Sequence, residues 1–398
     1  MYSREDVMTY VREEDVRFIR LSFCDPSGKQ KNVAVMADQL ETAFSTGISL
    51  DGSAVEGFGD AANSELLLVP DPSTLAVVPW RSQNGKVISM FCDLKKPDGS
   101  ECADDPRFIL RTAAEKAASM GISCNIGPEF EFYLFKRDAD GSPTDIPMDT
   151  AGYMDMAPED AGEDVRREIC QVLFQMGIKP ERTHHEEGPG QNEIDFRYGA
   201  PLQAADNATI FKWVVRTVSK TYGLYADFSP KPIRGRPGSG FHINISASDR
   251  DGNDVILPFM AGIMDHITEM TAFLNPSDES YMRLGEYKAP KYVSWSQGNR
   301  SQLIRVPFSK SPMQRIELRS PDPLANPYIA FALIIHAGLD GLERGLEPDK
   351  AENTNLFDPN TDIPEGLIQL PRSFEEAKKL AFHSSFVRSI LPDSYFGI

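Results

Sequence analysis

The chain has 398 residues, 41% of them hydrophobic, and a net charge of −18. This length allows two or three domains with real cores, while the negative charge argues against nucleic acids and anionic membranes as partners. Five cysteines without a CxxC pair, the absence of a secretion signal and the lack of an apolar run that could span a bilayer predict a cytoplasmic protein.

The first hundred residues predict a small domain of mixed strands and helices. Residues 1–14 read as a short polar helix, and residues 16–36 as a hairpin whose turn lies at 25–28. A helix is expected over 38–46, followed by strands near 66–69, 75–79 and 86–93. The polar stretch from Lys95 to Asp105 indicates a domain boundary.

The next part repeats a unit in which a helix leads into a strand. The helices begin near residues 104, 160 and 204 and close at Gly121, Gly177 and Gly223, where a left-handed C-cap is needed. The strands are expected over 122–135, 178–186 and 224–230. Two further helices are predicted over 255–274 and after Pro327. This order favours an α+β domain in which helices cover one sheet face and leave the other free to bind.

Three predicted strands carry polar groups opposite an apolar face. Glu129 and Glu131 alternate with phenylalanines, and side chains two residues apart in a strand share a face. The same alternation puts the residues of two further sets on one face each: Arg315, Glu317 and Arg319; His242, Asn244 and Ser246.

A fourth segment, residues 184–196, holds two histidines and four carboxylates. Gly188-Pro189-Gly190 splits it into two arms, so Glu186 and Glu193 can converge on one point. Bare carboxylates this close repel each other and call for a cation. Five carboxylates and one imidazole suit Mg²⁺ or Mn²⁺ bridging to phosphate oxygens. Any one strand alone is equally consistent with an exposed salt-bridge ladder or an acidic hairpin.

Together these motifs resemble the glutamine synthetase family, bacterial type I. The resemblance covers residues from about 15 to about 345, and it rests on LDGSAVEGF from Leu50, GPEFEF from Gly127, HHEEGPGQNEID from His184, GSGFH from Gly238 and RIELRSPDPLANPY from Arg315. It implies a β-grasp N-terminal domain over 15–97 and a catalytic domain over 104–398 with a curved antiparallel sheet. The implied reaction is ATP-dependent ligation of ammonia to the γ-carboxylate of L-glutamate through γ-glutamyl phosphate.

The resemblance also implies a role for individual residues. One metal ion is assigned to Glu131, Glu186 and Glu193, and the other to Glu129, His242 and Glu317. Arg283 and Arg319 are assigned to the substrate carboxylate, with Glu131, His242 and the close backbone approach at Gly238. The remaining assignments are Arg300, Arg305 and Arg315 to the phosphates, Tyr198 and Ser246 to the nucleotide, and Asp51 to ammonium.

Several positions depart from the family pattern. The flap motif ends in Glu-Ala-Pro in the family, whereas this chain has Lys288 before Ala289-Pro290, with Glu286 two residues earlier. Lys288 can turn to solvent while Glu286 closes the site, act as a neutral base, or pair with an acid on the amine substrate. Met313 stands where the family has a lysine near the nucleotide.

Two other functions stay open beside glutamine synthesis. One is a γ-glutamyl ligase for another amine, and the other is a silent homologue that binds nucleotide or glutamate. The family implies sites shared between subunits, so a homo-hexamer or dodecamer is expected.

Overall fold

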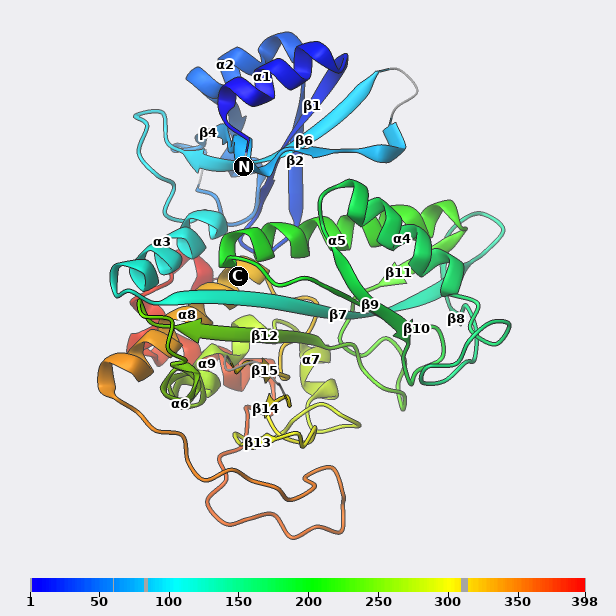
Figure 1. Cartoon of the computed structure of the whole chain (residues 1–398), viewed down its shortest axis with the longest axis vertical. Coiled ribbons are helices and arrows are strands. Elements are labelled where there is room, and N and C mark those ends of the chain that lie inside the picture. Colours follow the sequence, from blue (N-terminus) through cyan, green and yellow to red (C-terminus); the bar gives the residue numbers. More distant parts are fainter. Residues whose placement is uncertain (1, 60, 82–84, 309–313, 398) are drawn as a thin grey trace.

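The computed structural model describes residues 2–59, 61–81, 85–308 and 314–397, and its two lobes are stacked along the longest axis (Figure 1). Position 313 of the sequence lies outside the described residues. The elements of the N-terminal lobe are α1 (Arg4–Glu13), β1 (Val16–Cys24), β2 (Gln30–Met36), α2 (Leu40–Ser45), β3 (Ile48–Asp51), β4 (Glu65–Pro70), β5 (Ala76–Val77) and β6 (Lys86–Lys95).

The N-terminal lobe is a β-grasp sheet with two short helices. Its strand order is β2-β1-β6-β4-β3, with β5 added to β6. The hairpin of β1 and β2 turns where Gly28, at φ +82°, donates its N–H to Asp25 O at 2.8 Å. In contrast, β1 pairs with β6 in parallel. Val7, Ile19 and Leu40 are fully buried between helices and sheet. The expected fold of this lobe is therefore confirmed.

The second lobe contains a nine-stranded, mainly antiparallel sheet of order β13-β14-β15-β12-β7-β10-β9, with β8 and β11 on β7. Its elements are α3 (Pro106–Ser119), β7 (Ser123–Arg137), β8 (Pro143–Pro147), α4 (Glu163–Gln175), β9 (Pro180–His185), β10 (Gln191–Phe196), α5 (Pro201–Thr221), β11 (Leu224–Asp227), β12 (Phe241–Ser248), α6 (Ile256–Leu274), α7 (Asp278–Arg283), β13 (Trp295–Gln297), β14 (Ile304–Val306), β15 (Ile316–Leu318), α8 (Pro327–Arg344), α9 (Phe374–His383) and α10 (Ser385–Arg388).

Helices α3, α4 and α5 lie on the side of this sheet that faces the N-terminal lobe (Figure 1). The three predicted glycine caps follow them, because Gly121, Gly177 and Gly223 all adopt positive φ. Under the helices the sheet is aromatic. Phe130 of β7 stacks on Phe241 of β12 at 4.3 Å and on Phe211 of α5 at 5.3 Å between ring centroids. Stacked aromatic rings therefore fill the apolar face of the sheet, and the polar face remains available for binding.

Helices α6 and α8 cross at unusually close range. A Cβ atom at Gly262 would lie 2.1 Å from Ala337 O, and one at Gly341 would lie 2.3 Å from Pro258 O. Only glycine permits this approach. Both helices are apolar, yet no described helix of the chain is long and apolar enough to cross a membrane.

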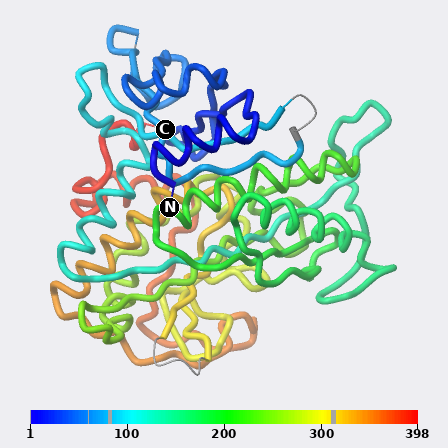
Figure 2. The backbone as a smooth tube through the Cα atoms, turned by 45° about the horizontal axis from the view of Figure 1, so that its top comes forward, coloured from blue at the N-terminus to red at the C-terminus, as the bar shows by residue number. Residues whose placement is uncertain are grey.

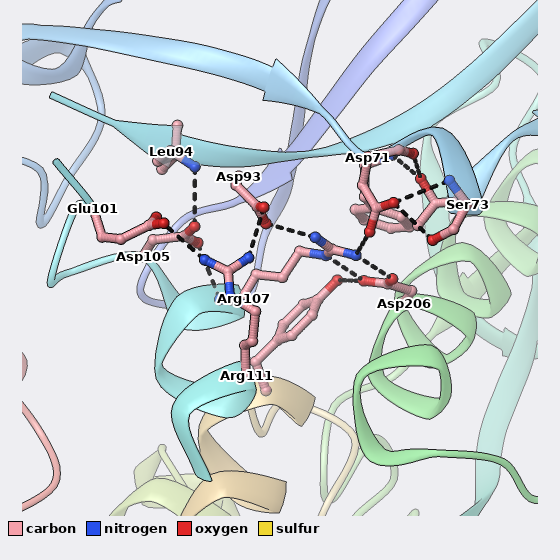
Figure 3. A network of polar contacts seen from close by, with 12 residues as sticks. Asp71, Ser73, Asp93, Leu94, Glu101, Asp105, Arg107, Arg111 and Asp206 are labelled. Carbon is pink, nitrogen blue, oxygen red and sulfur yellow. Dashed lines mark hydrogen bonds and ion pairs between the residues drawn. The ribbon is translucent and has the colours of Figure 1, made fainter. Parts of the chain in front are cut away.

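The two lobes are joined by a buried ionic network around Arg107 of α3 (Figure 3). Its guanidinium contacts Asp71 and Asp93 of the N-terminal lobe, each at 2.6 Å, and Asp206 of α5 at 3.1 Å. Arg111 adds a second contact to Asp93 at 2.6 Å.

The C-terminal residues return to the same junction. Ser394 Oγ donates to the Asp104 carboxylate at 2.5 Å, and the Tyr395 hydroxyl donates to Asp104 O at 2.9 Å. The red end of the tube accordingly lies beside the cyan segment that follows the first lobe (Figure 2). The Arg107 network therefore joins the two lobes, and the C-terminal residues pack on the segment that leads into it.

Candidate active site

A cavity of about 830 Å³ opens on the polar face of the large sheet. Acidic and basic side chains line it in nearly equal number, which is unusual for a ligand site. The predicted residues on its wall are Glu129, Glu131, Glu186, Glu193, Gly238, His242, Arg283, Glu286, Arg300, Arg305, Arg315, Glu317 and Arg319.

Strand register brings the acidic residues to one place. Glu193 of β10 lies opposite Glu131 of β7, and His242 of β12 lies opposite Glu129. Glu317 of β15 follows on the same face, two strands from β7. Because directly paired residues of antiparallel strands share a face, four strands present these groups together. The sequence-based alternation is confirmed.

His242 lies at the centre of this cluster. Its Nδ1 is 3.6 Å from a Glu317 oxygen and 3.9 Å from a Glu129 oxygen, while its Nε2 is 3.9 Å from Glu131. Glu129, His242 and Glu317 offer ligand atoms within 4.8 Å of one another, and so do Glu131, Glu193 and His242. These oxygen-rich sets, with one imidazole, fit Mg²⁺ or Mn²⁺.

The electrostatics of the cluster show a deficit of positive charge. Burial, together with neighbouring carboxylates, raises the pKa of Glu129 and of Glu131 to about 7. Burial and the Asp195 charge raise the pKa of Glu193 well above its usual range. Carboxylates in this state favour a bound cation.

Glu317 and His242 differ from the other members. Burial of Glu317 acts to raise its pKa, but Arg319, His242 and Arg305 outweigh burial and lower the pKa to about 2. Burial, helped by Arg319, lowers the pKa of His242 well below its usual range. A neutral imidazole is the form that binds metal.

Glu186 is held by a brace that the sequence did not reveal. His185 contacts Asp149 through Nε2 at 2.9 Å and Glu186 O through Nδ1 at 2.6 Å. Gly190 also donates to Asp149 at 2.9 Å. Glu186 itself contacts His184 Nε2 at 2.9 Å, and these two residues form a metal-type group with Glu193. Sequence analysis singled out this histidine pair but gave neither histidine a role.

The glycine segment before His242 allows a close backbone approach. A Cβ atom at Gly238 would lie 2.4 Å from Pro230 O and 2.9 Å from Arg283 Cγ. Gly240 donates its N–H to Glu131 at 2.8 Å, and Gln191 Nε2 donates to the same oxygen at 3.1 Å. Gln191, missed from the sequence, therefore orients Glu131.

Six arginines line the cavity, and five of them were predicted from the sequence. Arg283 and Arg319 are buried, and Arg283 donates to Ser320 O at 2.7 Å. Arg319 and Arg305 both pair with Glu317. The other cationic wall residues are Arg182, Arg300, Arg315 and Lys288. Guanidinium groups bind carboxylates and phosphates in a bidentate manner.

Three predicted residues lie outside this cavity. Tyr198 and Ser246 line an adjoining cavity of about 600 Å³ that shares Glu129 and Arg315 with the first. Asp51 lies at the end of β3 in the N-terminal lobe, where its carboxylate accepts from Ser53 N at 3.0 Å. Asp51 does not line its own chain's cavity.

The segment between α7 and β13 forms one edge of the cavity. Glu286 pairs with Lys231 at 2.6 Å, and Lys288 pairs with Glu187 at 2.5 Å. Lys288 therefore contacts an acid of the protein itself, and Glu286 is engaged away from the cluster.

Comparisons with known proteins agree with this geometry. Residues 15–97 match the family model "Glutamine synthetase, beta-Grasp domain", and residues 103–398 match "Glutamine synthetase, catalytic domain". The glutamine synthetase of Methanosarcina mazei is 43% identical, over 99% of this chain and 92% of that protein. The glutamine synthetase of Clostridium saccharobutylicum is 41% identical, over 100% and 93%.

Solved structures share the fold over the whole chain. A structure described as "GmaS/ADP complex-Conformation 1" has a TM-score of 0.89 at 28% identity and covers 98% of this chain and 93% of its own. Plasmodium falciparum glutamine synthetase has a TM-score of 0.88 at 22% identity, over 100% and 94%. On the sequence matches and the shared fold, this chain belongs to the glutamine synthetase family.

Proposed function

We propose that this protein makes L-glutamine from L-glutamate and ammonia with ATP. The observation that carries the proposal is one cavity in which an acidic cluster centred on His242 shares the wall with six arginines. Such a site can neutralise a polyphosphate and a second carboxylate and hold them in line. Full-length relatives named glutamine synthetase support the same reaction. No observation favours another amine or a silent homologue.

Both steps of the reaction balance without a further reactant. A γ-carboxylate oxygen of glutamate attacks the γ-phosphorus of ATP, and ADP leaves. The nitrogen of ammonia then attacks the acyl carbon, inorganic phosphate leaves, and the nitrogen gives up a proton. Attack requires neutral ammonia, so the ammonium ion must lose one proton beforehand. Exclusion of water protects the acyl phosphate between the steps.

The acidic residues are proposed to hold two Mg²⁺ or Mn²⁺ ions. Glu131, Glu186 and Glu193 are assigned to one ion, and Glu129, His242 and Glu317 to the other. When bound, such ions neutralise phosphate oxygens and polarise the transferred group. The donor chemistry and the raised pKa values of the free carboxylates support this assignment.

The basic residues are proposed to hold the two anions. Arg283, which lies beside Gly238, and Arg319 are both buried and are assigned to the carboxylate of glutamate. Arg300, Arg305 and Arg315 are assigned to the phosphates of ATP. Tyr198 and Ser246 are assigned to the nucleoside, because their cavity adjoins the main one through Arg315. The same proposal divides the chain into a β-grasp domain over 15–97 and a catalytic domain over 104–398.

Ammonium is proposed to be bound by Asp51 of one subunit at the cavity of the next, within a homo-hexamer or dodecamer. The position of Asp51 outside its own cavity supports this arrangement. Co-assembly of Asp51→Ala with Glu193→Ala subunits should restore activity, since some cavities then receive both intact halves. Mixed oligomers without activity, or active monomers in mass photometry, contradict the shared site.

The reaction itself is tested by phosphate release from ATP with Mg²⁺, with glutamate and ammonium supplied or omitted, and by direct measurement of glutamine. We expect release to require both substrates and Mg²⁺. Glu193→Ala should lose it while keeping the fold by circular dichroism. Full activity of that variant, or activity in excess chelator, would refute the proposal.

A further inference from the structure

Lys288 places its ammonium group between a carboxylate and an aromatic ring at the edge of the cavity. Nζ lies 2.5 Å from Glu187 Oε1 and 5.3 Å from the centroid of the Tyr153 ring. All three residues line the cavity, and the side chains of Lys288 and Glu187 are 48% and 34% exposed. A carboxylate beside an aromatic face is a recognition site for an organic ammonium ion.

The three residues come from separate segments, and two of these segments hold a residue in an unusual backbone conformation. Tyr287, next to Lys288, has φ +50°, and Met154, next to Tyr153, has φ +60°. A non-glycine residue keeps such a φ only where its surroundings fix it. Met154 N donates to His185 O at 3.0 Å, and the Tyr287 hydroxyl donates to Gly235 O. The ammonium position is therefore built by the fold.

On the other side of the same segment, Glu286 pairs with Lys231, whose side chain is 3% exposed. Lys231 also lies 4.8 Å from the Tyr287 ring centroid. The segment 286–288 is thus anchored at both ends, by Glu286 inward and by Lys288 across the cavity edge. If Lys288 leaves Glu187, that carboxylate, which is 34% exposed, becomes open to another cation.

We propose that Glu187 and Tyr153 form a subsite for an alkylammonium ion and that Lys288, by filling it, is a specificity-determining residue. The ammonium group of Lys288 already occupies this subsite. An organic amine that carries a second ammonium group, in addition to its nucleophilic nitrogen, is therefore repelled by Lys288 at the edge of the cavity. Ammonia carries no such group and is not excluded. The inference rests on the proposed function, since it defines which nucleophile the site accepts.

The chemistry follows directly if the lysine is removed. A primary alkyl diamine places one ammonium between Glu187 and Tyr153 and presents its other, neutral amine to γ-glutamyl phosphate. A carbon–nitrogen bond forms, inorganic phosphate leaves, and the nitrogen loses one proton. The product is a γ-glutamyl amide, and no further co-reactant is consumed.

The test compares 1,3-diaminopropane with n-butylamine, which is similar in length and lacks the second ammonium. Phosphate release with glutamate and ATP is measured for the wild type, for Lys288→Ala and for Lys288→Met, which keeps the stem. In both variants the kcat/KM ratio of the diamine to the monoamine should rise about tenfold over the wild type, as expected for a partly exposed charge pair.

Two further variants separate a charged subsite from a simple gain of space. Lys288→Ala combined with Glu187→Gln should lose the preference for the diamine. The control is Lys291→Ala. Lys291 belongs to the segment between α7 and β13, but it lies over the Tyr292 ring and outside the cavity wall, so this variant should keep the wild-type ratio. An unchanged ratio in both Lys288 variants, or a preference that survives Glu187→Gln, overturns the inference.

Failure of the proposed function is detected separately. If the wild type releases no phosphate with glutamate and ammonium, that function is wrong. The subsite is then judged by saturation-transfer NMR with 1,3-diaminopropane. Binding to Lys288→Ala, lost on adding Glu187→Gln, supports it. Equal saturation-transfer signals from Lys288→Ala and from Lys288→Ala combined with Glu187→Gln refute it.

Discussion

Replacing Arg107 by methionine should destabilise the protein strongly, because the side chain is 4% exposed and forms ion pairs with three aspartates. Methionine keeps much of the volume but leaves Asp206 buried without its charged partner, with only the Tyr328 hydroxyl still donating to it at 2.7 Å. Burial already raises the pKa of Asp206 against the influence of Arg107. Removing one partner of a buried ion pair costs about 3–5 kcal/mol.

The expected size of the effect is measurable by calorimetry. A chain of this length has an unfolding entropy of about 0.8 kcal/mol/K, so a loss of about 4 kcal/mol lowers Tm by about 5 °C. The assay is the first calorimetric transition at pH 7. The matched control is Arg4→Met, because the Arg4–Glu41 pair is exposed (42% and 64%) and should contribute about 0–1 kcal/mol.

A second measurement tests the cause of the loss. Arg107→Met with Asp206→Asn removes the stranded charge and should recover part of the lost Tm, whereas adding Glu41→Gln should recover none. The destabilisation should also shrink at acidic pH, where the aspartates take up protons. If Arg107→Met shifts Tm no more than Arg4→Met, the network does not join the lobes as argued.

Three further predictions concern other parts of the molecule. Burial raises the pKa of Asp105 to about 7, so this acid binds its proton more tightly in the folded state. Its contribution to stability is therefore lost as pH rises from about 4 to about 7. Asp105→Asn should flatten the fall of Tm with pH over that range, and an unchanged slope of Tm against pH contradicts this. Gly262→Ala must push α6 away from α8, because the new Cβ would lie 2.1 Å from Ala337 O. Denaturant titration should show a free energy of unfolding lower by about 1–3 kcal/mol. A variant as stable as the wild type would mean that the two helices can move apart without cost. His185→Asn should weaken Mg²⁺ activation about 10- to 100-fold, as loss of a group behind a metal ligand does. Because His185 and Asp149 are both buried, Tm should fall as well, so Mg²⁺ dependence is measured below the transition, where circular dichroism shows the fold. A normal Mg²⁺ dependence contradicts the brace.

Local patterns predicted the parts of the fold that have a short repeat. The alternation around Glu129 and Glu131 fixed their shared face, and the glycines at 121, 177 and 223 marked three helix ends. The alternation at 315–319 predicted β15, whereas β13 and β14 have three residues each and gave no periodic signal. Their arrangement, with Arg305 opposite Glu317, is a property of the complete sheet.

The missed site residues depend on contacts between distant segments. Asp149 reaches His185 from a loop without periodicity, 36 residues earlier in the chain. Lys288 stood out only as a departure from a family pattern, and nothing in its neighbours indicated Glu187 as its partner. Such pairs form when loops are packed against the sheet, and local propensity carries no information about them.

The two faces of β7 also govern where the chain tolerates a change of length. One extra residue inserted after Phe130 would turn Glu131 toward the aromatic layer under the helices and Phe132 toward the cavity, because side chains along a strand alternate between the two faces. By contrast, the β7–β8 turn at Gly141 has open space around it. A short peptide tag should therefore be accepted in that turn, whereas even a single-codon insertion or deletion within the strand should abolish function.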